Sequence, residues 1–235
     1  GARSAQPVLA GELQQAIEQR QFINHYQPKV HFATGTLAGV ETLVRWDRPG
    51  HGLVYPDQFI TLVKDTQKAL PIDPKTQKRC KLVFIGGEGP VVGGKLTKGN
   101  SEEIKALLTK VLEEKGFEVY SDDMEIKGKI EDFRNKYDFV LVAMDVVGFA
   151  QYNTVRLKWA KPIDQPWYVR ELPTVFVSFA GTNMLIDLTM SRTYINAYMD
   201  GEPQIRSFVD KLVGESPFKG RYNDNVWCGR WDTKL

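Results

Sequence analysis

The sequence has few of the residues that redox and metal chemistry depend on. It contains two cysteines, Cys80 and Cys228, and three histidines, all before residue 52. Two thiols cannot form a disulfide framework and lack the spacing of a metal site, so we expect unpaired cysteines in a reducing compartment. No apolar run approaches the roughly 20 residues needed to cross a bilayer, and we recognise no signal peptide. We therefore expect a cytoplasmic protein with no membrane partner.

Excess charge of either sign is also missing. Lys and Arg number 31 against 29 Asp and Glu, and the densest basic run is KTQKRCK at residues 75–81. Nucleic-acid binding requires a clustered basic face that neutralises phosphates, so we expect no nucleic-acid partner. The composition, with 42% hydrophobic and 26% charged residues, is ordinary for a globular protein.

The first sixty residues predict a helix followed by a β-hairpin. Apolar residues recur at helical spacing over residues 8–19, and residues 22–32 then alternate between apolar and polar side chains. A second alternating run follows at residues 36–46. A three-residue loop containing Gly35 would pair Gln27 near Glu41 and place both on one face with Arg45, whereas a two-residue loop would separate them. Glu41 and Arg45 share a face in either case.

The same segment carries ordered motifs, HYQPKV, ATGTLAGVETLVRW and HGLVYPDQFI. Over residues 9–60 they resemble the N-terminal segment of an EAL domain, the cyclic-di-GMP phosphodiesterase barrel. The resemblance implies that Glu41 corresponds to the glutamate that binds the catalytic metal, with Thr42 in place of the usual alanine. It also implies that Gln27 and Arg45 correspond to residues that contact the dinucleotide.

The EAL pattern ends near Ile60 and does not return later in the sequence. The family draws further carboxylates, an asparagine and a catalytic lysine from later strands, and two-metal chemistry needs several oxygen ligands around each ion. We therefore expect no phosphodiesterase activity and no cofactor. Magnesium is expected only if the remnant binds a metal through Glu41.

Residues 81–235 alternate between strand and helix patterns. Buried-strand runs are KLVFIGG, DFVLVAMDV and TVFVSFA, with further strands at FEVYS and TYINAY, and a short helix is expected around residues 126–133. Longer helices are expected after Asn100 and from Pro203, ending at Gly116 and Gly214. The pattern predicts an α/β fold, a mainly parallel sheet of about five strands with helices on both faces, as in flavodoxin-like or Rossmann-like sandwiches. The N-terminal helix and β-hairpin add to this sandwich.

The stretch GPVVGGKL at residues 89–96 is one residue short of a phosphate-binding loop. Leu96 occupies the position of the magnesium-binding hydroxyl, Pro90 removes an amide, and helix signals start only at Asn100. We therefore expect GPVVGGKLTKGN to be a long flexible turn at the first strand-to-helix crossover rather than a nucleotide site.

A second family resemblance covers residues 60–235. RLKWAKPIDQPWYVRELPTVFVSFA and TYINAYMDGEPQIRSFVDKLVGESPFKG resemble the C-terminal α/β sandwich domain of glycoside hydrolase family three, of the bacterial β-N-acetylglucosaminidase type. The resemblance implies that the catalytic groups belong to a separate barrel. Two further sets of residues leave alternatives open. The first set are candidates to line a cleft, although surface carboxylates are commoner: Glu88, Asp122, Asp123 and Asp145. The second set are candidates to stack on sugar rings, although packed aromatics are commoner: Trp159, Trp167, Trp227 and Trp231.

The two resemblances meet at Ile60 and Leu62. We expect an EAL-like fragment over residues 1–60, a linker over 61–80 and a sandwich domain over 81–235, which favours an engineered chimera without catalytic activity. Apolar faces left uncovered by the join favour self-association, as a dimer or by segment exchange. Two alternatives stay open: a module that binds cyclic di-GMP or another guanine nucleotide, and residual glycoside hydrolase activity.

Overall fold

The computed structural model describes residues 12, 15–16, 19–30, 36–55, 60–86, 88–92, 95–98, 101–121, 129–146, 157, 166–180 and 183–220. Their strands form three sheets, of which the largest has six strands in the order β4-β11-β10-β9-β5-β8. These strands span β4 Thr61–Asp65, β5 Arg79–Gly86, β8 Glu118–Tyr120, β9 Phe139–Asp145, β10 Thr174–Ser178 and β11 Thr193–Asn196.

The predicted fold class is confirmed, because five strands of this sheet run parallel. In chain order the five are arranged 2-1-3-4-5, which is the flavodoxin-like arrangement. The sixth strand, β4, pairs antiparallel with β11 at one edge. This strand, with the sequence TLVKD, lies inside residues 61–80, where we expected a linker. It forms because Asp65 pairs with Thr193 and Thr61 pairs with Asn196 at the edge of the sheet.

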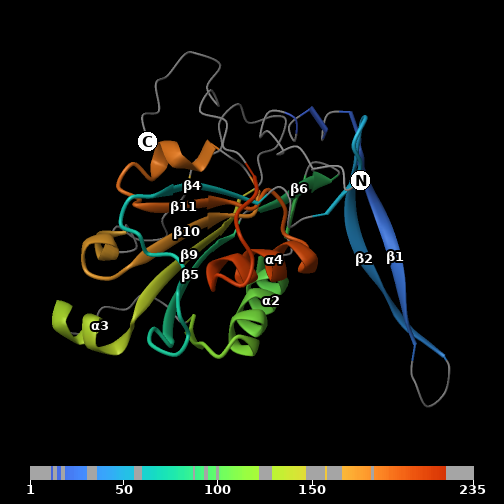
Figure 1. The fold of residues 1–235 in the computed structure, drawn as a ribbon. Helices are drawn as coiled ribbons and strands as arrows, with labels where there is room; N and C mark the ends of the chain where they lie inside the picture. Colours follow the sequence, from blue (N-terminus) through green and yellow to red (C-terminus); the bar gives the residue numbers. More distant parts are fainter. Residues whose placement is uncertain are drawn as a thin grey trace.

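Helices cover one face of this sheet and shorter helical segments cover the other (Figure 1). The helices α2 (Ser101–Glu114) and α4 (Glu202–Leu212) pack their apolar residues into a core that includes Leu82, Leu141 and Val177. The opposite core contains Val142 and Phe176 and is covered by α3 (Ile130–Lys136) with the 3₁₀ helices η3 (Trp167–Arg170) and η4 (Asn183–Asp187).

Glycine ends both long helices where the sequence predicts. Gly116 adopts φ +95° and Gly214 φ +78°, which is the left-handed region that favours glycine. The chain closes back on each helix, because the Phe117 amide donates to the Leu112 carbonyl at 3.2 Å and the Glu215 amide donates to Asp210 at 2.8 Å.

A separate three-stranded sheet, in the order β1-β2-β3, forms near the N-terminus. The predicted hairpin consists of β1 (Phe22–Val30) and β2 (Leu37–Arg48), and a third strand, β3 (Gly52–Val54), was not expected from the sequence. Figure 1 shows the hairpin extending from the side of the sandwich, with β1 outermost. Of the predicted helix at 8–19, the described residues 12, 15 and 16 are helical.

The glycine-rich run between β5 and α2 differs from the flexible turn that we predicted. Residues Glu88–Val92 (β6) and Lys95–Lys98 (β7) form a two-stranded antiparallel hairpin. The register of this hairpin shifts between Glu88 and Val91, where the consecutive residues Gly89 and Pro90 lie, because proline has no amide hydrogen to donate to the ladder. The run still lies at the first crossover, as the sequence suggested.

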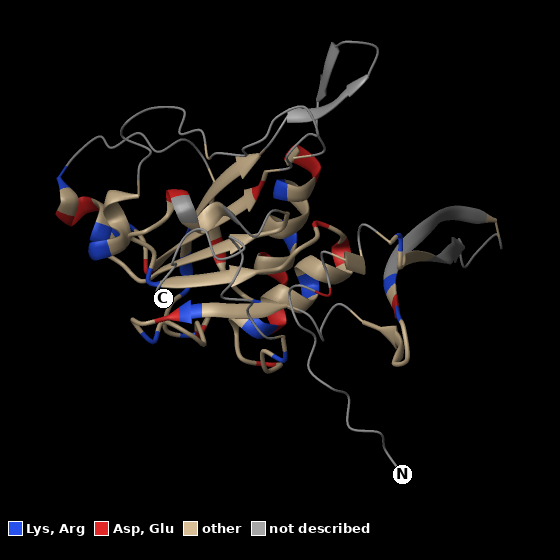
Figure 2. Ribbon diagram, turned by 90° about the horizontal axis from the view of Figure 1, so that it is seen from above, with Lys and Arg blue, Asp and Glu red and all other residues tan. Residues whose placement is uncertain are grey.

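The remaining features follow the composition. Figure 2 shows acidic and basic residues interspersed over the helices and loops. Among the described residues no helix is both long and apolar enough to cross a membrane. Cys80 is a free thiol buried in the sandwich core, where burial raises its pKa, and Cys228 lies outside the described residues.

Candidate functional site

The backbone of the hairpin brings the EAL-like positions together. Gln27 pairs directly opposite Glu41, the register that we predicted for a three-residue loop, and Ile23 pairs with Arg45. The loop at 31–35 and the side chains of Gln27 and Glu41 lie outside the described residues. Because strand residues alternate between faces, this register places positions 27, 41 and 45 on one face.

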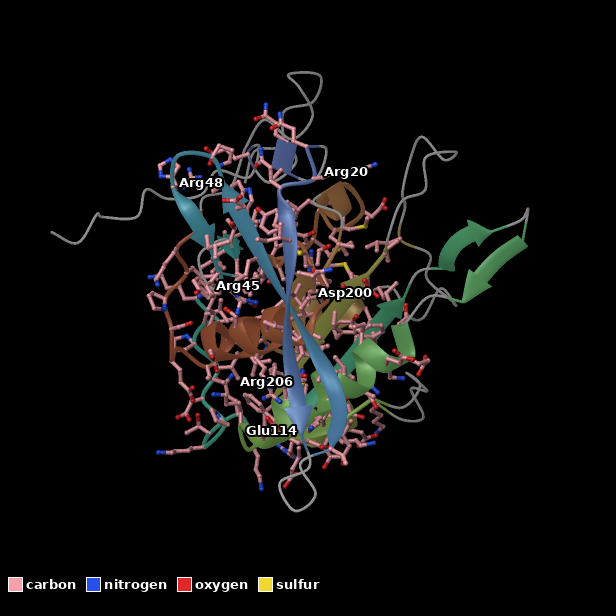
Figure 3. All side chains as sticks on the ribbon, turned by 90° about the vertical axis from the view of Figure 1, so that its right-hand side faces the viewer. Arg20, Arg45, Arg48, Glu114, Asp200 and Arg206 are labelled. Carbon is pink, nitrogen blue, oxygen red and sulfur yellow. The ribbon has the colours of Figure 1, made fainter. Side chains whose placement is uncertain are left out.

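Arg45 is the member of this group whose side chain is described. Its guanidinium lies 4.6 Å from the centre of the Tyr55 ring, and Tyr55 itself is 51% exposed. Asp47, two residues further along the same face, is exposed. Figure 3 views the hairpin from outside and places Arg20 near the start of β1 and Arg45 and Arg48 beside β2. On this face Tyr55 and Asp47 are exposed and Arg45 is half-buried.

The opposite face of the hairpin is attached to the sandwich. Trp46 is 1% exposed and forms a small hydrophobic cluster with other apolar side chains from both parts of the chain: Ala16, Phe22, Val54, Tyr198 and Met199. Tyr198 and Met199 follow β11 in the sandwich, and the Tyr198 hydroxyl bonds to the Thr61 hydroxyl at 3.3 Å. The two parts of the chain thus share one apolar contact.

Polar contacts within the N-terminal part hold Trp46 and Arg48 in place. The Trp46 indole N–H donates to Gln21 Oε1 at 2.9 Å. The Arg48 guanidinium lies 5.5 Å from the Trp46 ring and donates to both carboxylate oxygens of Glu12, at 3.0 and 2.8 Å. Arg48 is 6% exposed, and both bonds to Glu12 come from one nitrogen, Nη2, which pairs the buried positive charge with a carboxylate.

The hairpin does not assemble a metal centre from the described residues. No three His, Cys, Asp or Glu side chains gather where they could hold an ion within the part of the chain that the structure describes. Hydrolysis by two metal ions requires several oxygen ligands, so Glu41 alone does not fit that chemistry. An arginine stacked on a tyrosine is instead suited to contact a phosphate or a flat base.

A second group of polar residues lies at the carboxyl ends of the parallel strands. Asp145 ends β9 and pairs with Gly86 at the end of β5, and Ser101 opens α2 above them. A Cβ atom on Gly86 would lie 2.5 Å from Ser101 Cβ and Oγ, so glycine is required for this close approach. In open α/β sheets ligands bind at this edge, where the strand order reverses.

Asp145 is the unusual member of this group. It is 3% exposed, and its Oδ1 has no hydrogen-bond partner among the described residues. Burial raises the pKa of Asp145 to about 6, with a further increase from the neighbouring charge of Asp200, whereas a hydrogen bond from Ser101 opposes the shift. A carboxyl with this pKa exchanges its proton within reach of neutral pH, and Asp200 is a second acid near it.

The other residues singled out from the sequence divide as follows. Trp167 packs 4.9 Å from the Phe133 ring and 5.7 Å from the Tyr168 ring, which is aromatic packing rather than an open stacking platform. Asp122, Asp123, Trp159, Trp227 and Trp231, and the side chain of Glu88, lie outside the described residues. The sequence did not single out Ser101 or Asp200, although the position of Asp145 at the end of a buried strand pointed to this edge.

Comparison with known proteins separates the two parts of the chain. Residues 10–79 match the family model described as the EAL domain. The bifunctional diguanylate cyclase/cyclic di-GMP phosphodiesterase MucR of Pseudomonas aeruginosa is 50% identical over 58 residues, which are 25% of this chain and 8% of that protein. The match extends beyond Ile60 through β4 to the start of β5.

A different set of relatives covers most of the chain. The β-N-acetylglucosaminidase/β-glucosidase of Cellulomonas fimi is 30% identical over 179 residues, which are 75% of this chain and 32% of that protein. The solved structure of β-glucoside phosphorylase BglX is similar with a TM-score of 0.62 at 33% identity, over 76% of this chain and 32% of its own. The chain thus spans about a third of the length of these relatives.

Both predicted resemblances are confirmed. The N-terminal segment is EAL-like, and most of the chain is similar to the glycoside hydrolase family three relatives, as expected for a chimera. At the predicted join, Ile60 lies in the core of the sandwich with no exposed surface, directly before β4.

Proposed function

We propose that this 235-residue chain is a non-catalytic α/β protein in which an EAL-like hairpin is docked on a sandwich domain. The observation that carries the proposal is the orientation of the hairpin. Its Trp46 face packs against Tyr198 and Met199 of the sandwich, and positions 27, 41 and 45 lie on the opposite face. This orientation supports a hairpin whose Glu41 gains no metal ligands from the sandwich.

The chemistry of both relatives supports the same conclusion. Past Ile60 the chain enters a sheet of different topology, so the later EAL strands that would supply further metal ligands are replaced by the sandwich. Retaining glycoside hydrolysis requires two groups about 5 Å apart that flank one bond. The three histidines all lie in the EAL-like part, and Asp145 is a single buried carboxyl.

We further propose that the join at residues 60–62 is artificial. The two sets of relatives act on unrelated substrates according to their names, cyclic di-GMP and β-linked sugars, and each is matched over a minor part of its length. A natural splice would have to discard two active sites at once, whereas deliberate or laboratory recombination has no such requirement.

Turnover assays test the absence of catalysis. We expect no hydrolysis of cyclic di-GMP with magnesium or manganese above the buffer rate. We likewise expect no release from a chromogenic β-glucosaminide or β-glucoside, with or without inorganic phosphate. Turnover of either substrate that survives repeated purification, and that disappears with Glu41→Gln or Asp145→Asn, would overturn the proposal.

The second candidate function is binding of cyclic di-GMP or another guanine nucleotide, and magnesium belongs to this candidate alone. The pairing of Gln27 with Glu41 and the stacking of Arg45 on Tyr55 favour it. Calorimetry with the dinucleotide, with and without magnesium, tests it against Arg45→Ala and the matched control Arg20→Ala, since Arg20 is exposed in the turn before β1. Heat that is lost with Arg45→Ala and kept with Arg20→Ala supports this candidate, and equal heats for both variants exclude it.

A further inference from the structure

Two buried side-chain oxygens at the carboxyl edge of the main sheet lack a hydrogen-bond partner. Asp145 ends β9 and is 3% exposed, and its Oδ1 is unpartnered in the part of the chain that the structure describes. Gln204 on α4 is 1% exposed, and its Oε1 is likewise unpartnered within the described ranges. A buried acceptor without a donor costs free energy, and a charged one costs more, so each of these oxygens requires an explanation.

Both residues lie on the same side of the sheet and at the same end of its strands. Alternation along β9 puts Asp145 on the side of Leu141 and Ala143, which belong to the core covered by α2 and α4. The Gln204 side-chain amide donates to the Ala197 carbonyl, directly after β11. Because β9, β10 and β11 run parallel, the first turn of α4 is held at the edge where β9 ends.

A second carboxylate lies at this edge. Asp200 (Figure 3) is half-buried between β11 and α4, four residues before Gln204. It is near enough to Asp145 for its negative charge to raise the pKa of that carboxyl, in addition to the larger effect of burial. The Ser101 hydroxyl at the start of α2 bonds to Asp145 as well. Carboxylate, amide and hydroxyl oxygens from β9, α2 and the start of α4 are thus gathered at one edge.

We propose that this edge binds a calcium ion, with Asp145 Oδ1, the Asp200 carboxylate and Gln204 Oε1 as its protein ligands. Carboxylate and amide oxygens are the ligands that hard divalent cations prefer. The two carboxylates together match the charge of the ion. A cation also supplies the partner that both buried oxygens lack, and it replaces the repulsion between the two carboxylates with attraction.

Calcium fits these ligands better than magnesium does. The ligands come from a strand end, a loop and a helix, and Ca²⁺ accepts such an irregular set because its coordination is flexible. Mg²⁺ requires nearly ideal octahedral geometry and gives up its waters reluctantly, whereas Asp145 is almost wholly buried. Because only two of the ligands are charged, we expect weak binding, with a Kd of roughly 0.1–1 mM.

Urea unfolding of the EDTA-treated full chain tests the proposal, with KCl added to hold the ionic strength constant. About 10 mM CaCl₂ should lower the unfolding equilibrium constant of the wild type roughly tenfold to a hundredfold, and MgCl₂ should lower it less. Asp145→Asn keeps the size of the side chain and removes its charge, so it should lose the response. The matched control is Asp138→Asn, which should keep it, because Asp138 precedes the other end of β9 and is paired with Arg79.

NMR spectroscopy of the wild type locates the ion without any substitution. Calcium should shift the side-chain amide signal of Gln204 and the backbone signals of Asp145 and Asp200, and it should leave the signal of Asp138 unchanged. A wild type that calcium stabilises no more than KCl does, an equal response from Asp145→Asn, or a response lost with Asp138→Asn would each overturn the site. A response that disappears with Glu41→Gln, with shifts confined to the hairpin, would also overturn it, because the ion would then lie on the EAL-like face.

Discussion

Replacing Trp46 with alanine should detach the hairpin from the sandwich while the sandwich stays folded. Trp46 is 1% exposed and belongs to a small cluster that is separate from the two cores of the main sheet. The Phe22 ring stacks on it at 5.9 Å, and its indole bonds to Gln21. A β-hairpin alone is marginally stable in water, so it depends on this contact.

The expected magnitude follows from the size of the buried ring. Truncation of a buried tryptophan to alanine costs about 3–5 kcal/mol, because apolar burial is lost and a cavity remains. The change also leaves the Gln21 side chain without its indole donor and uncovers the buried Arg48–Glu12 pair. At about 1.4 kcal/mol per tenfold change, the lower value raises the population of the undocked hairpin about a hundredfold.

Limited proteolysis followed by mass spectrometry measures this population. We expect cleavage within residues 36–54 to accelerate by about two orders of magnitude, because cleavage follows the open fraction when reclosing is fast. Leu53→Ala is the matched control, since Leu53 is 43% exposed and its truncation should change the rate little. Equal cleavage rates for the wild type and Trp46→Ala would refute the docking role, as would loss of the sandwich in the same transition.

Three further predictions concern the sandwich. The pKa of Asp145 is raised from 3.8 to about 6, so its contribution to the stability of the fold is present below about pH 4 and is lost as the pH rises to about 6. The variant Asp145→Asn should remove this pH dependence in urea titrations. It should also raise the free energy of unfolding at pH 7 by up to about 3 kcal/mol. Asp138 accepts three hydrogen bonds from Arg79, which lower its pKa, so Asp138→Ala should cost about 2 kcal/mol at pH 7 and less as the pH falls below about 4. A Cβ atom on Gly86 would meet Ser101 at 2.5 Å, so Gly86→Ala should cost about 1–3 kcal/mol, and the double variant with Ser101→Gly should cost less than the sum of the single changes. Strict additivity, or a pH dependence that Asp145→Asn leaves unchanged, would contradict these assignments.

Local patterns were sufficient to predict most elements of the fold. The buried runs at β5, β9 and β10 and the glycines that end α2 and α4 lie where periodicity and capping place them. Of the two registers that the sequence left open, the hairpin adopts the one that pairs Gln27 with Glu41. Strand β4 lies inside the segment expected to be a linker, because these five residues become a strand only when β11 offers its edge.

The candidate sites were only partly accessible to the same reasoning. Motif order pointed to Gln27, Glu41 and Arg45, but it could not indicate which face of the hairpin would meet the sandwich. Asp145 was recognisable as an acid at a strand end, whereas its raised pKa depends first on burial and then on the charge of Asp200, 55 residues later in the chain. Desolvation and long-range charge are properties of the packed chain, and no local pattern encodes them.

The sequence by itself determined the two family resemblances and the α/β class, because each depends on short-range patterns and ordered motifs. Only the tertiary structure decided that the residues after Ile60 form an edge strand and that Trp46 faces Tyr198 and Met199. These outcomes depend on which apolar faces and backbone edges find partners once the chain is compact. That choice is made by contacts between residues far apart in the sequence.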